Sequence, residues 1–172
     1  LHIETPPEHL VMSGGLFHGF QLWVNLPAAK KWSKPAYQDL RASDVKLLAS
    51  SDGGTLIRVI AGEVAGHFGP GSTQTPISIV HATLAPGARL ELPWKKEYNA
   101  LVYTLNGHGS VGEMKHPVQM GELAVMGDGD TLIVQADATQ ESRSLQMDVL
   151  ILGGQPIKER SEEPRLNSSH DE

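Results

Sequence analysis

The chain begins LHIETPPEH, so an imidazole at His2 and a carboxylate at Glu4 are separated by a single residue. If this stretch is extended, side chains two positions apart lie on the same side of the chain, roughly 7 Å apart. Both groups are common metal ligands, but a catalytic metal site usually takes three or more ligands from the protein. His2 and Glu4 are therefore candidate metal ligands, and a complete site needs further donors.

The other histidines do not supply those donors at any recognisable spacing. No His-x-His pair occurs anywhere in the chain. His81 interrupts the alternating run ISIVHATL, which favours a hydrogen-bonded or half-exposed strand histidine over a ligand. His18 is near the pair in sequence, but hydrogen bonding within a loop is the favoured interpretation. The histidines in predicted loops or turns, for which we expect no specific role, are His67, His108 and His116.

Composition argues against several classes of function. The 172 residues carry a formal net charge of −6, which disfavours a broad electrostatic surface for nucleic acid or anionic membranes. Cysteine is absent, so neither a disulfide framework nor a thiolate metal site can form. No apolar run approaches the ~18 residues of a membrane span. We expect no direct nucleic-acid or membrane binding and a cytoplasmic location, with the nucleus as an alternative in a eukaryote.

The pattern of apolar runs and turn residues predicts an all-β protein. Short β-prone runs recur with turn signals between them, and no long helical pattern is present. Residues 42–48 (ASDVKLL) leave two alternatives open, a short helix or a strand. We therefore predict an antiparallel sandwich or barrel. The runs that form it are residues 55–66, 77–93, 99–112, 116–136 and 144–154.

An earlier run, FQLWVNL at residues 20–26, is predicted to be a mostly buried strand with Trp23 in the core. The lysine- and proline-rich residues that follow are expected to form an exposed connector. Without partner strands, the same run would leave Trp23 on an unpaired apolar edge. Trp32 and Trp94 are near lysines, so we expect them to cover barrel edges.

The turn spacing resembles that of cupins, whose fold is an antiparallel β-barrel, also called a double-stranded β-helix. In that family, each of two motifs begins with a glycine and leads to metal ligands. Gly87 and Gly121 match the two starting glycines. From them, the ligand positions fall on Pro93, Lys95, Asn99 or Ala100, and Leu132. A proline nitrogen, an ammonium group and an alkyl chain do not coordinate iron or zinc under ordinary conditions, so the resemblance implies a cupin barrel without a metal.

A more specific resemblance, to the pirin family, rests on LHIETPPEH, HGFQLWVNLP with PAYQDL, IRVIAGE, and PGARLELP followed by YNALVYTLNGHGSVG. These segments occur in pirin order over residues 1–159. Pirins are two tandem cupin barrels. The resemblance implies an N-terminal barrel that binds one metal through three histidines and one glutamate, and a C-terminal barrel without metal.

His2 and Glu4 match the H-x-E motif that supplies half of that ligand set, whereas the HPHRGFE-type motif that supplies the other two histidines is absent. We therefore expect residues 1–36 to be a remnant of the metal-binding barrel, with the missing donors upstream. Residues 37–159 are expected to form the C-terminal barrel. The implied metal is iron, with zinc, manganese, copper and nickel as alternatives. Residues 160–172 resemble translated adapter sequence, and we expect a disordered and non-native tail.

The resemblance implies two functions for the intact parent, which we expect to be monomeric. One is a quercetin 2,3-dioxygenase, in which the metal binds a deprotonated flavonol substrate and Glu4 serves as ligand and base. The alternative is an iron-dependent regulator that binds transcription factors or metabolic enzymes. Sequence features do not choose between them. For the 172 residues alone, the incomplete ligand set predicts an inactive barrel scaffold.

Overall fold

The computed structural model describes residues 8–16, 18–141 and 145–159. The chain divides into two compact units, Leu1–Tyr37 and Gln38–Glu172. Among the described residues, no helix is long and apolar enough to cross a membrane. The predicted tail at residues 160–172 lies outside the described residues, so its disorder stays a prediction.

The described part of the first unit contains two short helices and no β-strand. These are α1 (Glu8–Ser13) and the 3₁₀ helix η1 (Ala28–Lys30). The predicted strand at residues 20–26 is therefore wrong, and Trp23 is 82% exposed. Its indole Nε1 donates to Gln21 Oε1 at 2.8 Å, a local bond that does not bury the ring. A strand needs a neighbouring strand, and the described residues of this unit provide none.

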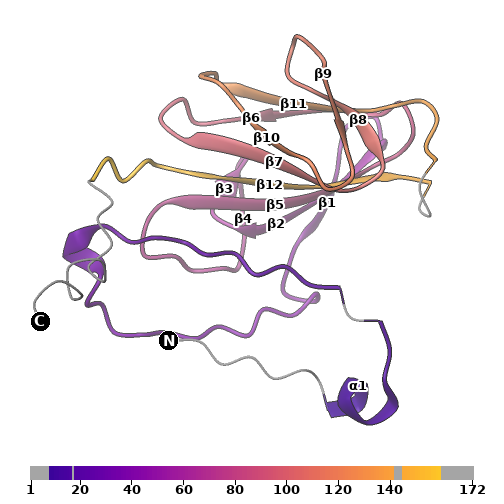
Figure 1. Cartoon of the computed structure of the whole chain (residues 1–172). Coiled ribbons are helices and arrows are strands. Elements are labelled where there is room, and N and C mark those ends of the chain that lie inside the picture. The colour runs from indigo at the N-terminus through magenta and orange to yellow at the C-terminus, as the bar shows by residue number, and fades with distance from the viewer. Residues whose placement is uncertain (1–7, 17, 142–144, 160–172) are drawn as a thin grey trace, which may run out of the picture. The chain divides into compact units, whose positions relative to one another are not determined.

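The second unit is all β, as predicted. The twelve strands formed by its described residues pair antiparallel in a six-stranded sheet, a four-stranded sheet and a two-stranded hairpin (Figure 1). The six-stranded sheet contains β1 (Leu47–Ala49), β2 (Thr55–Ala61), β5 (Ile77–Leu84), β12 (Met147–Gly154), β7 (Asn99–Asn106) and β10 (Leu123–Val125), in that order. The four-stranded sheet contains β6 (Arg89–Pro93), β11 (Thr131–Ala136), β8 (His108–Val111) and β9 (His116–Gln119). The hairpin pairs β3 (Glu63–Val64) with β4 (His67–Phe68).

The open choice at residues 42–48 is resolved by β1. Leu47 and Leu48 belong to this strand and pair with β2, whereas residues 42–45 form a turn. The helix alternative is therefore wrong.

One core lies between the two larger sheets, because every second side chain of each strand points inward. Strand β5 shows the alternation most clearly: Val80, Ala82 and Leu84 are buried, and the residues between them are half-buried. Strand β12 alternates in the same way and pairs with β5 along its whole length. The turn predicted before β6 is also present, with Gly87 at a φ of 77°, a left-handed conformation that glycine adopts without a Cβ penalty.

The difference between the two units predicts where proteases act first. Limited trypsin digestion should cleave after Lys30, Lys31 and Arg41, because these residues are exposed and lie outside the β-strands. The expected product is a stable fragment that begins near residue 42, measured by mass spectrometry. Survival of the bonds after Lys30 and Lys31 while the strands of the second unit are cut would contradict this division.

Candidate functional site

The two predicted metal ligands, His2 and Glu4, lie outside the described residues, so their geometry is not defined. Within the part of the chain that the structure describes, no group of three or more His, Cys, Asp or Glu side chains could hold a metal ion. The metal assignment to His2 and Glu4 stays a prediction.

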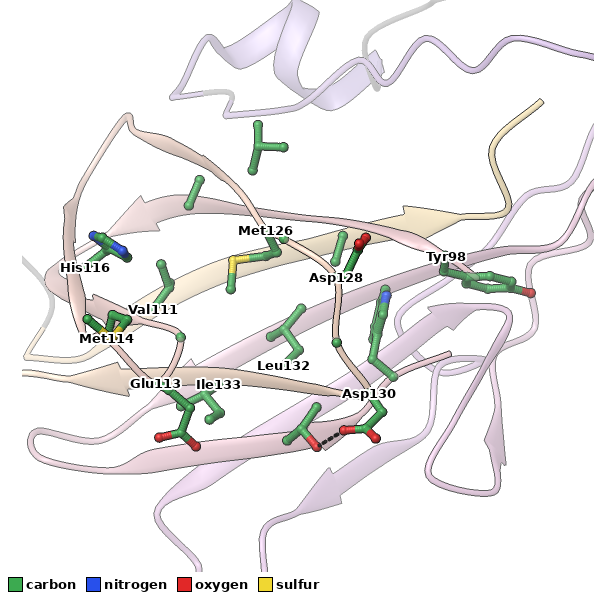
Figure 2. A pocket seen from close by; sticks show the side chains of 18 residues that line it. Tyr98, Val111, Glu113, Met114, His116, Met126, Asp128, Asp130, Leu132 and Ile133 are labelled. Atoms are coloured by element: carbon green, nitrogen blue, oxygen red, sulfur yellow. Dashed lines mark hydrogen bonds between the residues drawn. The ribbon is translucent and has the colours of Figure 1, made fainter. Parts of the chain in front are cut away.

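One hollow of the described barrel is a cavity of about 660 Å³. It lies where β6, β8 and β10 end and where β7 and β11 begin, so strand ends from both sheets surround it. Its apolar lining comprises Trp94, Ala100, Val111, Met126, Leu132 and Ile133. Figure 2 shows Met126 and Leu132 directed toward the same space. The polar rim comprises Tyr98, Glu113, His116, Asp128 and Asp130.

The cavity forms where the two cupin-like motifs meet. In the first motif, the side chains that point into the barrel are not those of Pro93 and Lys95, which the sequence predicted. In β6 the buried side chains are Leu90 and Leu92, and the alternation continues to Trp94. Pro93 and Lys95 are consequently exposed rather than directed into the barrel. Placing the two ligand positions on Pro93 and Lys95 is therefore wrong by one residue. Neighbouring residues of a strand point to opposite faces, so Trp94 points into the barrel and Pro93 and Lys95 point away from it.

The remaining motif positions do line the cavity. Ala100 is buried, whereas Asn99 is exposed, so Ala100 is the inward member of that pair. Leu132 is also buried against the cavity. Ala100 and Leu132 thus present a methyl group and an isobutyl group to this space, and the Trp94 indole lies beside them, which makes it an apolar site.

Trp94 is the residue whose role the sequence analysis missed. We expected it to cover a barrel edge, yet it is only 9% exposed and lines the cavity. Its backbone N–H donates to the Asp130 carbonyl oxygen at 2.8 Å, which fixes the end of β6. Its indole Nε1, by contrast, is buried and has no hydrogen-bond partner among the residues that the structure describes. The spacing of Leu90, Leu92 and Trp94 was the signal that could have revealed its inward direction.

Gly153 allows Trp94 to occupy this position. A Cβ atom on Gly153 would lie 2.6 Å from Cζ2 of the Trp94 ring and 2.1 Å from the Asn99 carbonyl oxygen. Both distances are far below ordinary contact, so only glycine permits this packing of β12 against β7 and the indole.

The cavity rim is acidic. Asp130 accepts hydrogen bonds from Thr131 Oγ1 at 3.2 Å and from Lys96 Nζ at 3.3 Å, and the Lys96 bond is the main cause that lowers the pKa of this carboxyl. Lys95, the other nearby cation, instead pairs with Glu63 at 3.4 Å, and this bond raises the pKa of its ammonium group. Asp128 forms no ion pair among the described residues, and it lines a neighbouring hollow together with Lys96 and Lys158.

A separate polar cluster occupies the outer face of the six-stranded sheet. Asp148 accepts a hydrogen bond from Thr83 Oγ1 at 2.7 Å, and its Oδ1 lies 3.3 Å from His81 Nε2. Arg58 Nη1 lies 3.5 Å from His81 Nδ1. The bond with His81 is the largest cause that lowers the pKa of Asp148. His81 is thus a hydrogen-bonded, half-exposed strand histidine, as predicted.

Three histidines assigned to loops or turns lie in strands instead. His67 lies in β4, His108 in β8 and His116 in β9. His108 also has a defined partner, because its Nδ1 lies 2.6 Å from Asp137 Oδ2, and His116 lines the cavity. The assignment to loops or turns was therefore wrong for all three, whereas the expectation that they have no specific role stays a prediction.

The cupin-type fold is confirmed by comparison with known proteins. Residues 79–162 match the model of the pirin C-terminal cupin domain. The solved structure of a quercetin 2,3-dioxygenase from Acinetobacter baumannii is similar, with a TM-score of 0.71 and 28% identity, and the match covers 83% of this chain and 48% of that chain.

Sequence relatives cover almost the whole chain. A pirin-like protein of Arabidopsis thaliana is 33% identical over 164 residues, which are 92% of this chain and 51% of the relative. Pirin of Homo sapiens is 31% identical over 161 residues, again 92% of this chain and 51% of the relative. The chain thus spans about half the length of these curated relatives.

Replacing Gly153 with alanine should disturb the cavity. We expect Gly153→Ala to lower the free energy of unfolding by about 1–3 kcal/mol, because the added methyl group overlaps Trp94 and the Asn99 carbonyl. Denaturant unfolding measures the change. Gly127→Ala is the matched control, since a Cβ at Gly127 meets nothing within 4 Å. Equal stability of the two variants would contradict the predicted overlap.

Asp148 should contribute stability that depends on pH. Its pKa is lowered in the folded state, so the contribution is present above the unfolded-state value near 3.9 and is lost as pH falls through the lower folded-state pKa. Asp148→Asn should therefore cost about 1 kcal/mol at pH 7 and progressively less below about pH 4. Thermal unfolding at both pH values tests this. Exposed Glu141→Gln is the control, and a cost for Asp148→Asn that is constant with pH would refute the assignment.

Proposed function

Because this chain belongs to the pirin family, we propose that the whole protein is a metal-dependent dioxygenase that cleaves a flavonol such as quercetin. The observation that carries the proposal is the similarity of this chain to the structure of a quercetin 2,3-dioxygenase. The H-x-E pair at the beginning of the sequence supports it, because it places an imidazole and a carboxylate two residues apart.

His2 and Glu4 have the donor chemistry that non-haem iron takes, namely imidazole nitrogen and carboxylate oxygen. Two donors are nevertheless too few for a catalytic centre, and no described group of three acidic or histidine side chains adds to them. The proposal therefore assigns the remaining histidine ligands to residues beyond these 172. When bound, the metal would supply the site where the flavonol and dioxygen react, and we derive no reaction step from this incomplete set.

The barrel formed by the second unit has a supporting role in this proposal. The inward motif positions at its mouth are Ala100 and Leu132, and neither these side chains nor the neighbouring Trp94 have metal-binding atoms suited to iron. We therefore assign the oxygen chemistry to the part of the protein that contains His2 and Glu4 and not to the cavity at residues 94–133.

A second candidate is an iron-dependent regulator that binds a transcription factor or a metabolic enzyme. It is favoured by exposed apolar side chains on one face of the edge strand β10, namely Leu123 and Val125, which are 53% and 75% exposed. Such side chains are typical of protein contact surfaces when they gather in one patch.

Metal content and turnover test the proposal. The iron-loaded whole protein should consume dioxygen in the presence of quercetin and release carbon monoxide. His2→Ala or Glu4→Ala in the whole protein should lower bound iron to well below one equivalent, measured by mass spectrometry of the metal, and abolish turnover. The 172-residue chain should bind iron weakly and below one equivalent, because it has too few donors.

His67→Ala is the matched control, since His67 is an exposed histidine of β4 and should leave metal content and turnover unchanged. Iron retained at one equivalent after both His2 and Glu4 are removed would refute the ligand assignment. Full iron loading without quercetin turnover, together with recovery of a defined protein partner, would favour the regulator.

A further inference from the structure

We propose that the β8–β9 hairpin and the end of β10 form a binding site for a soft monovalent metal ion, Cu⁺ in the cell. Its ligands are the thioether sulfurs of Met114 and Met126 and the imidazole of His116, and all three side chains line the cavity at the barrel mouth. The site is separate from the proposed iron centre, because it uses neither His2 nor Glu4.

The hairpin brings Met114 and His116 close together. Met114 lies in the turn between β8 and β9, which is closed by the Lys115 N–H donating to the Gly112 carbonyl oxygen at 3.1 Å. His116 is the first residue of β9 and pairs with Val111 at the end of β8. Val111 is only 3% exposed, and directly paired residues share a face of the sheet, so the imidazole lies on the inward face of the hairpin.

Met126 approaches the same hairpin from the end of β10. A Cβ atom on Gly112 would lie 3.7 Å from Met126 Cε, so the methyl group bonded to the sulfur is close to the turn. Figure 2 shows the side chain of Met126 directed toward the side of the cavity where Val111 and His116 lie. The backbone N–H of Met126 donates to the Ala100 carbonyl oxygen at 2.9 Å, which fixes the point from which this side chain extends.

The chemistry of these donors selects a soft ion. Thioether sulfur binds Cu⁺, whereas Mg²⁺, Ca²⁺ and Mn²⁺ prefer oxygen ligands, and imidazole also suits copper. The chain has no cysteine, and three of its five methionines occur within residues 114–126. The described residues have no metal-binding group of three His, Cys, Asp or Glu side chains, but such a group does not include methionine, which supplies two of the three donors here.

The charges near the hairpin do not decide which metal binds. Glu113 and Asp128 line the same cavity, Lys115 lies in the turn, and Arg89 Nη2 is 3.9 Å from Glu113 Oε1. A carboxylate beside an imidazole suits Zn²⁺, so a site formed by His116 and Glu113 is the competing assignment. The two assignments differ in whether methionine sulfur contacts the metal, and that contact can be measured directly.

NMR of the 172-residue chain with ¹³C-labelled methionine methyl groups tests the contact. The probe is Ag⁺ in chloride-free buffer, because it is as soft as Cu⁺ and needs no reductant. At one equivalent we expect Ag⁺ to shift the methyl signals of Met114 and Met126 and the ring-proton signals of His116. Met120 is the matched control, since it is 65% exposed and follows β9 at the end of the hairpin opposite the turn, where its N–H donates to Gly107.

The affinity for Cu⁺, measured without oxygen by competition with a coloured chelator, tests each ligand. Met114→Leu, Met126→Leu and His116→Gln should each weaken binding by at least about tenfold, because even the partners that orient a metal ligand are worth about 10–100-fold in affinity. Leucine keeps the volume and apolar character of methionine, so the barrel should remain folded. The two methionine variants also identify their own methyl signals. Met120→Leu and His67→Ala should leave the affinity unchanged.

The proposal is overturned if one equivalent of Ag⁺ shifts no methionine signal, or if it shifts Met120 as much as Met114 and Met126. It is also overturned if the three single variants keep the affinity of the unaltered chain. Zn²⁺ that shifts the ring signals of His116 where Ag⁺ leaves both methyl signals in place would instead assign the imidazole to a site with Glu113. Because no iron or quercetin is used, these results do not depend on the dioxygenase proposal.

Discussion

Two antiparallel sheets face each other in the described barrel, and each strand must place every second side chain between them. This constraint determines both the core and the cavity. Along β5 and β12 it produces the buried rows that include Val80 and Ile151. At the end of β6 it places Trp94 inside and Pro93 outside, so an indole occupies the mouth of the barrel. A shift of one residue would have exchanged these two side chains.

The same constraint separates the chemistry of the protein into two regions. The metal-ligand candidates His2 and Glu4 belong to the beginning of the chain, whereas the barrel mouth is apolar and contains one unpartnered donor. An apolar wall does not hold a hard or borderline metal ion, but it does favour burial of an organic ligand.

Acidic side chains lie in two separate places of the described barrel, on the outer face of the six-stranded sheet and at the barrel mouth. On the outer sheet face, Asp148 is stabilised by Thr83 and His81, which makes that cluster a structural element of the sheet. At the barrel mouth, Asp130 pairs with Lys96, and Asp128 lines a hollow together with Lys158. Acidic groups thus stabilise the sheet at one place and border the cavity at another.

Local sequence patterns determined much of this protein. The alternation in ISIVHATL, the turn at Gly87 and the family segments were sufficient to predict an all-β cupin-type barrel and a half-exposed His81, because each signal is contained in a few neighbouring residues. Tertiary structure decided the rest. The segment at residues 20–26 has an apolar composition suited to a strand, but burial requires a partner strand that its own sequence does not encode. The inward direction of Trp94 depends on the register of β6 with β11, and the contact between His81 and Asp148 exists only because β5 and β12 are neighbours in the sheet. Pairings between distant strands depend on sheet order, a property of the whole chain that no short stretch contains.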